Sequence, residues 1–152
     1  MTLPSRVAEV IHAYDALARA RAGLASATIF TFAPPPSVVL SSGSSITLVN
    51  RISGRREHTS LGGTLADEVF TIDGEILGLA VGSDDETARD ALTIALACYD
   101  ELDALIVESH YSFGLDGVVA TLGAFEYLYS GLDGNRIQGL RYSIDVRAEL
   151  VT

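Results

Sequence analysis

Residues 139–151 constrain the fold more than any other part of this chain. Apolar and polar side chains alternate strictly along this stretch. The apolar set is Leu140, Tyr142, Ile144, Val146, Ala148 and Leu150, and the polar set is Arg141, Ser143, Asp145, Arg147 and Glu149. A period of two over this length predicts a strand with one buried face and one charged, solvent-facing face. Such a strand belongs to an antiparallel sheet that is covered on one side only.

The length and charge of the chain limit its class. Its 152 residues fit a single domain, 1–152, with a sizeable core. Ten basic residues stand against 20 acidic ones, for a net charge of −10. This balance argues against a protein that grips nucleic acid, because phosphate contacts need clustered basic side chains.

The chain is also unusually apolar. Apolar residues make up 48% of it and the mean hydropathy is +0.31. No apolar run approaches the roughly 20 residues that span a bilayer, and the N-terminal segment lacks the apolar core of a signal peptide. We therefore expect no membrane association, and expect the excess apolar surface to lie in subunit contacts. A single cysteine, Cys98, excludes an internal disulfide and is compatible with a reducing cytosol.

Two helices are predicted. Residues 3–22 carry apolar side chains at helical spacing, with Pro4 in the first turn and Gly23 at the end. A longer helix over residues 84–109 follows a capping box in which Ser83 caps the N-terminus and Glu86 reaches back to it. The apolar stripe of this second helix makes it the best candidate to cover the sheet.

Five strands are predicted, at 28–32, 46–52, 65–81, 118–129 and 139–151. The prolines 34–36 predict a rigid connector after the first strand. Asp73-Gly74 is a hairpin signal, but the uninterrupted apolar phase favours one long strand over 65–81. Residues 118–129 lack clean alternation, which predicts burial on both faces, and residues 131–135 form the last turn. The fold class is therefore α+β: a mixed or antiparallel β-sheet covered by one long helix plus an N-terminal helix, in the order α-β-β-β-α-β-β.

Residues 53–63 have no periodicity and are rich in Gly and Ser, which predicts a long loop or mobile arm. This segment carries Arg55, Arg56 and His58. Three interpretations stay open: a solvated loop tip, an arm that orders on an acidic neighbouring subunit, or a nucleic-acid contact.

No motif predicts catalysis, a metal or a cofactor. The three histidines, His12, His58 and His110, lie far apart and form no ligand pair. Cys98 sits beside apolar helix positions, as a buried small hydrophobic residue does. The acidic residues around Asp84 are explained by helix capping. We expect a protein that is not an enzyme.

Four features recur in a characteristic order along the whole chain: the Pro-rich exit of the first strand (34–36), a long strand entered through Asp67 and Glu68, the Ala-rich helix from Ala88 to Glu108, and the alternating run that ends at Leu150. In the order and character of these elements, the chain resembles the tail terminator proteins of long-tailed, siphovirus-type bacteriophages.

The resemblance implies a structural protein of the virion, assembled in the bacterial cytoplasm and placed at the head-proximal end of the tail. Such proteins form a homo-oligomeric ring, usually a hexamer, which caps the tail tube and ends its polymerisation. The ring contacts the tail tube protein and the head–tail connector protein, and DNA passes through its lumen without specific binding. No catalytic, cofactor or metal residues follow from the resemblance.

Six residues are candidates for subunit or partner contacts: Arg55, Arg56, His58, Arg141, Asp145 and Arg147. The charged face of the last strand mixes signs, so we expect it to contact a neighbouring subunit or to line the ring. Two other functions remain open: a head-completion or connector protein of the same joint, and a small α+β ligand-binding or enzymatic module.

Overall fold

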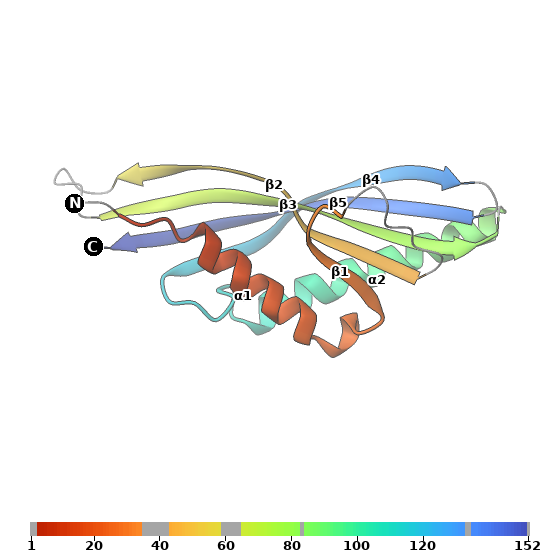
Figure 1. The fold of residues 1–152 in the computed structure, drawn as a ribbon, viewed down its shortest axis with the longest axis horizontal. Coiled ribbons are helices and arrows are strands. Elements are labelled where there is room, and N and C mark those ends of the chain that lie inside the picture. Colours follow the sequence, from red (N-terminus) through yellow and green to blue (C-terminus); the bar gives the residue numbers. More distant parts are fainter. Residues whose placement is uncertain (1–2, 35–42, 59–64, 83, 133–134, 152) are drawn as a thin grey trace.

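The computed structural model describes residues 3–34, 43–58, 65–82, 84–132 and 135–151, with the backbone alone at 129–132 and 135–136. A long twisted sheet carries two α-helices on one face (Figure 1). In chain order the elements are α1 (Val7–Ala20), the short 3-10 helix η1 (Ala22–Leu24), β1 (Ala27–Phe32), β2 (Gly43–His58), β3 (Leu65–Val81), α2 (Asp85–Glu108), β4 (Val118–Leu132) and β5 (Asn135–Val151).

The sheet has five strands in the order β1-β2-β3-β5-β4. β1 runs parallel to β2, and every other neighbouring pair is antiparallel. The prediction of an α+β protein with a mixed sheet and two helices is confirmed. The element order differs in detail, because η1 intervenes between the first helix and the first strand.

The stretch 65–81 is one continuous strand, as its apolar phase predicted. β3 has 17 residues, which corresponds to roughly 55 Å at about 3.3 Å per residue. It pairs with β5 from Leu65 to Val81 without a register shift. Two of its glycines lie where other groups come close: a Cβ on Gly74 would lie 2.3 Å from the Tyr142 ring, and one on Gly78 would lie 2.0 Å from the Ala91 carbonyl oxygen.

The prediction of a loop over 53–63 is wrong for residues 53–58, which belong to β2 and pair with β3. Apolar alternation is missing there because this half of β2 lies at the margin of the sheet and is largely exposed. Gly54 also faces Phe70 so closely that a Cβ would lie 2.5 Å from the Phe70 Cβ. The rest of the predicted loop lies outside the described residues.

The expectation that 118–129 is buried on both faces is also wrong. β4 is the last strand of the sheet, and Val119, Phe125 and Tyr127 are 56%, 58% and 48% exposed. A register shift between Leu122 and Phe125 changes the phase of the strand, so one clean alternation cannot run through it. The predicted turn at 131–135 falls partly on residues outside the description.

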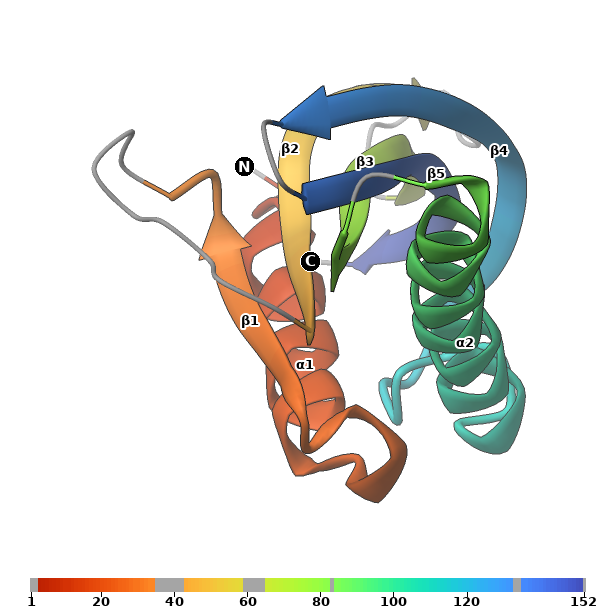
Figure 2. The same cartoon turned by 90° about the vertical axis from the view of Figure 1, so that its right-hand side faces the viewer.

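The core lies between the sheet and the two helices. The apolar face of β5 is buried from Leu140 to Leu150, and α2 packs mainly on β3 and β5. This arrangement confirms that the closing strand turns its apolar side toward the second helix. Figure 2, viewed along the long axis, shows both helices on the same side of the sheet, α1 beside β1 and α2 toward β4.

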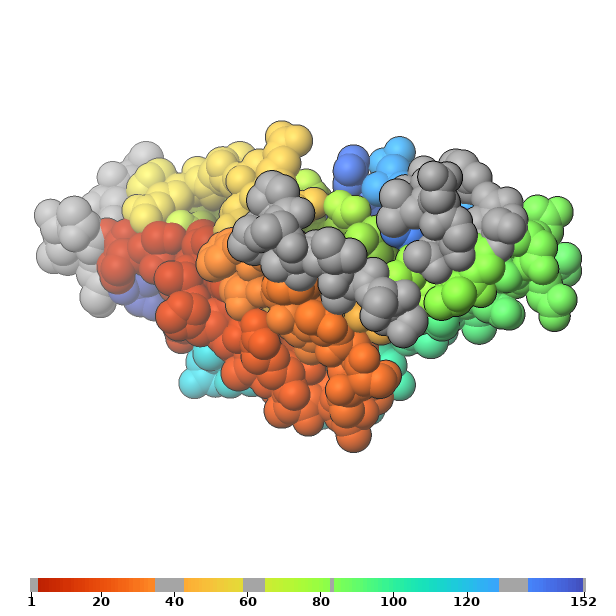
Figure 3. Space-filling view, turned by 45° about the vertical axis from the view of Figure 1, so that its right-hand side comes forward, coloured from red at the N-terminus to blue at the C-terminus, as the bar shows by residue number. Residues whose placement is uncertain are grey.

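Helix ends differ slightly from the predicted ones. α1 begins at Val7 rather than at residue 3, and α2 is capped by Asp84, whose carboxylate accepts a hydrogen bond from the Thr87 amide at 2.8 Å. Ser83, the predicted cap, lies outside the described residues. In the space-filling view α1, η1 and β1 bulge from the middle of an elongated body (Figure 3).

Candidate interaction surfaces

One face of the sheet is not covered by either of the described α-helices and is lined by charged side chains from neighbouring strands. Arg147, near the end of β5, has one guanidinium nitrogen 2.5 Å from the Asp67 carboxylate and another 3.1 Å from the Glu57 carboxylate. Arg55 donates to the same Glu57 at 2.7 Å. The hydrogen bonds from Arg55 and Arg147 to Glu57 lower the pKa of this carboxylate. The ion pairs therefore link β2, β3 and β5 on the open face.

The same face continues along β5 with mixed charge. Asp145 accepts a hydrogen bond from the Thr71 hydroxyl at 3.0 Å. Arg141 stands in register between Glu75 of β3 and Glu126 of β4. Of the predicted contact residues, Arg55, Arg141, Asp145 and Arg147 thus share one surface, and we call it the open face.

Arg56 and His58 do not belong to the open face. Successive residues of a strand point to opposite sides, and Arg56 lies 3.7 Å from the Glu68 carboxylate on the helix side. His58 is in register with the buried Ala66 and is itself exposed. The adjacent arginines of the sequence are therefore split between the two sides of the sheet.

Glu68 is a buried carboxylate that holds the start of α1. It accepts hydrogen bonds from the Arg6 amide at 2.8 Å and from the Ser5 hydroxyl at 3.1 Å. A negative charge at this place stabilises the N-terminus of a helix. Nothing local in the sequence indicates this cap, because it lies more than 60 residues away along the chain.

Both margins of the sheet present strand edges. β1 covers β2 only as far as Val49, so no described strand lies on the outer side of β2 from Asn50 to His58. β4 forms the other margin. Near its beginning the Ala120 amide donates a hydrogen bond to the Tyr111 carbonyl at 2.6 Å, and no described strand lies on the outer side of β4. Unpaired edges of this kind are sites for pairing with another chain.

An exposed apolar patch lies where β4 meets α2. Phe125 packs against Tyr99 with ring centroids 5.4 Å apart. Tyr127 is 48% exposed, and Leu96 of α2 is 38% exposed. We call these four residues the aromatic patch. The apolar residues of β4 could have indicated the aromatic patch from the sequence, but they were interpreted as part of the core.

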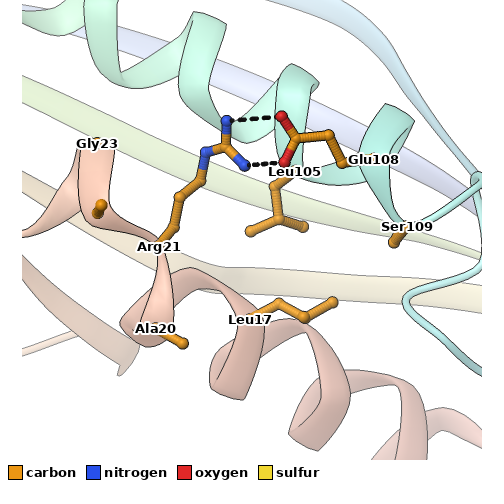
Figure 4. Close-up of a pocket in the computed structure, with 8 residues that line it drawn as sticks. Leu17, Ala20, Arg21, Gly23, Leu105, Glu108 and Ser109 are labelled. Atoms are coloured by element: carbon orange, nitrogen blue, oxygen red, sulfur yellow. Dashed lines mark hydrogen bonds and ion pairs between the residues drawn. The ribbon is translucent and has the colours of Figure 1, made fainter.

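A hollow of about 550 Å³ lies between the end of α1 and the end of α2 (Figure 4). The Arg21 guanidinium crosses it and forms ion pairs with Glu101 at 2.6 Å and Glu108 at 2.7 Å. These pairs raise the pKa of Arg21, the bond to Glu108 most, and lower that of Glu108. Because this cation is already neutralised by two carboxylates, we interpret it as a clamp between the helices.

The histidine, cysteine and acidic side chains of the described residues do not gather into a metal site. Cys98 is buried in α2, and its burial raises the pKa of the thiol. The described part of the chain holds no group of histidine, cysteine and acidic residues that could bind a metal ion. Among its helices, none is long and apolar enough to cross a membrane.

In comparisons with known proteins, no family model and no curated protein sequence matches the chain. The functional assignment therefore depends on the surfaces described above and on the layout of the elements.

Proposed function

We propose that the chain is a structural subunit that assembles with copies of itself into a closed ring. The observation that carries this proposal is the pair of sheet edges, at the outer half of β2 and along β4, together with the aromatic patch beside β4. Exposed edges and apolar patches are costly in a lone soluble protein and useful in a subunit. Two different edges on one molecule suit head-to-tail contacts, which generate rings when the rotation closes.

More particularly, we propose that it is a tail terminator of a long-tailed bacteriophage, acting as a ring of six copies. The ring would cap the tail tube, end its polymerisation and offer the head–tail connector a joining surface. The virion tail at its head-proximal end is the proposed location, reached by assembly in the host cytoplasm. The support is the element layout, in which an N-terminal helix, a long strand pair, an Ala-rich helix and a closing strand pair follow one another.

The charge of the molecule supports passage of DNA without binding. A net charge of −10 per copy repels a phosphate backbone. The arginines Arg55 and Arg147 of the open face are each engaged by carboxylates, so they are less available to phosphates. We propose that the open face contacts a neighbouring copy or lines the lumen.

The test is assembly with a tail tube protein. Native mass spectrometry and negative-stain electron microscopy of the purified chain, alone and mixed with polymerising tube protein from the same genome, should reveal rings at one end of each tube. Tubes should stop growing when the chain is added. A chain that stays monomeric in both conditions and leaves tube length unchanged would contradict the proposal.

A further inference from the structure

We infer that the outer half of β2 in one copy docks along β4 of the next copy, so that the sheet continues across the subunit boundary. This inference rests on the proposed ring and names the contact that builds it. The two partners are the segment Asn50–His58, called here the basic edge, and the strand Val118–Leu132, called here the aromatic edge.

The outer backbone groups of the basic edge pair with no strand in the described part of the chain, and the charge of this segment is unusual. β1 leaves β2 after Val49, and no described strand replaces it. Within the basic edge three arginines stand against one acid, Glu57, in a chain whose overall charge is strongly negative. Ile52, which is 37% exposed, adds an apolar side chain. The basic edge therefore offers backbone donors and acceptors flanked by positive charge.

The aromatic edge has the opposite character. Val119, Phe125 and Tyr127 are exposed on β4, and Glu126 is the only charged residue of the strand. Edge strands of monomeric proteins are usually protected by Lys, by Pro or by charged side chains that point inward. β4 contains neither Lys nor Pro.

The flank beside the aromatic edge is acidic. Tyr99, which stacks on Phe125, has its pKa raised by burial and then by the charges of Asp103 and Asp100. These carboxylates of α2 therefore lie close to the aromatic patch. Over its whole length α2 carries only one basic residue, Arg89, among its acids.

Charge selects this pairing among the possible ones. Two basic edges placed together would set arginine against arginine, and two aromatic edges would bring the acidic flanks of both copies together. Pairing unlike edges with the helix sides continuous instead sets Arg51 and Arg55, which are on the open face, near Glu126, whose side chain projects to the same face. The pairing sets Ile52 and Arg56, which are on the helix side, near the aromatic patch and the acidic flank. It also satisfies the exposed backbone groups of both strands, as in strand addition between chains. A contact between unlike surfaces is the kind that closes a ring.

Disulfide cross-linking tests the contact directly, because the native Cys98 is buried. Ser53→Cys would be combined in one chain with Thr121→Cys, Ala124→Cys or Glu126→Cys. The three combinations test three different alignments of the basic edge along β4. At least one combination should give an oxidised ladder of covalent oligomers, whereas each single variant should give at most dimers. Ser53→Cys with His12→Cys, an exposed position on α1, is the control and should give no ladder.

Charge exchange gives a second measurement. The Arg51→Glu/Arg55→Glu variant should raise the concentration for half-assembly at least about tenfold, and Glu126→Arg, which reverses the charge that faces them on β4, should recover part of that loss. Arg19→Glu, an exposed charge change on α1, should leave assembly nearly unchanged. Thermal unfolding of each variant is the control that tests whether the fold is retained.

The outcomes separate this inference from the proposed function. Rings without a cross-link from any combination, and with assembly unchanged by Arg51→Glu/Arg55→Glu, would overturn the contact and leave the ring standing. Ladders that remain open, with no closed ring and no effect on tube length, would support the edge pairing and overturn the tail terminator. A chain that neither cross-links nor assembles would overturn both.

Discussion

At the scale of single residues, two buried phenols define the centre of the core. The hydroxyl oxygens of Tyr14 in α1 and Tyr142 in β5 lie 2.7 Å apart, and both side chains are fully buried. Burial is the largest cause that raises the pKa of each phenol. Each hydroxyl thus serves as the buried partner that the other requires.

We expect Tyr14→Phe to destabilise the protein by about 1–3 kcal/mol, because it leaves the Tyr142 hydroxyl without its partner. Tyr142→Phe should cost a similar amount. The double variant should lose less than the sum of the two, since no orphaned hydroxyl remains. Urea unfolding of the four proteins measures the coupling. Strict additivity would show that the two hydroxyls do not depend on one another.

The same pair predicts a pH dependence in alkali. Both phenols keep their protons in the folded chain above their ordinary pKa of 10.0, whereas the unfolded chain loses them there. The folded state then binds more protons than the unfolded state, so stability is complete below pH 10 and falls as the pH rises above it. The free energy of unfolding between pH 9 and 11 should fall more steeply for the native chain than for Tyr14→Phe/Tyr142→Phe. Equal slopes would contradict this account.

At the scale of elements, the contact between α2 and the sheet depends on a missing side chain. A Cβ at Gly78 would lie 2.0 Å from the Ala91 carbonyl oxygen, and backbone cannot move aside as a flexible side chain can. We expect Gly78→Ala to destabilise the protein by more than about 2 kcal/mol, in the range of overpacked cores. Gly139→Ala is the matched change, since its nearest neighbours would lie at 3.3 Å. Thermal unfolding of both variants should rank Gly78→Ala clearly below Gly139→Ala.

The start of α2 depends on the Asp84 cap. We expect Asp84→Ala to cost about 1 kcal/mol, the usual value for loss of an N-cap. Asp90→Ala, an exposed acidic position of the same helix, should cost little. Denaturant titrations followed by circular dichroism compare the two. If both variants lose the same amount, charge rather than capping accounts for the effect of Asp84.

Periodicity explains which elements could be predicted. β3 and β5 follow a period of two because one face is buried along nearly their whole length, and α2 follows a helical stripe for the same reason. The outer half of β2 has no covered face, so residues 53–58 lacked any pattern and were interpreted as a loop. β4 carries apolar residues for an exposed edge, which a single sequence cannot distinguish from core. The Glu68 cap joins residues distant in the chain, and only the fold brings them together.

The predicted contact residues could likewise be identified where the sequence alternates regularly, and were missed or misplaced at the edges of the sheet. Arg141, Asp145 and Arg147 were predicted from the alternation of the last strand and do share the open face. Arg55 joins them only because β2 continues past the predicted end of its strand. The aromatic patch was missed, since its members were assigned to the interior.

At the scale of the whole molecule, assembly should respond to salt. The proposed contact joins the basic edge to an acidic flank, and charges at exposed sites are screened as the Debye length shrinks from about 10 Å at 0.1 M to about 3 Å at 1 M salt. We expect ring formation to weaken over this range, while the stability of the isolated subunit changes little because its ion pairs are mostly exposed. Mass photometry across a salt series measures ring formation, and thermal unfolding measures the stability of the subunit. Assembly that strengthens with salt would indicate a contact dominated by apolar burial.

Successive side chains of β3 point to opposite faces of the sheet, so two adjacent residues of this strand can contact the two sides of the molecule. Asp67 faces outward and binds Arg147, whereas its neighbour Glu68 faces inward and holds the first turn of α1. A partner that displaces Arg147 on the open face would therefore act one residue away from the cap of a helix on the opposite side. In an assembled ring, this short path would make the helix layer of each copy sensitive to what touches the bare side of its sheet.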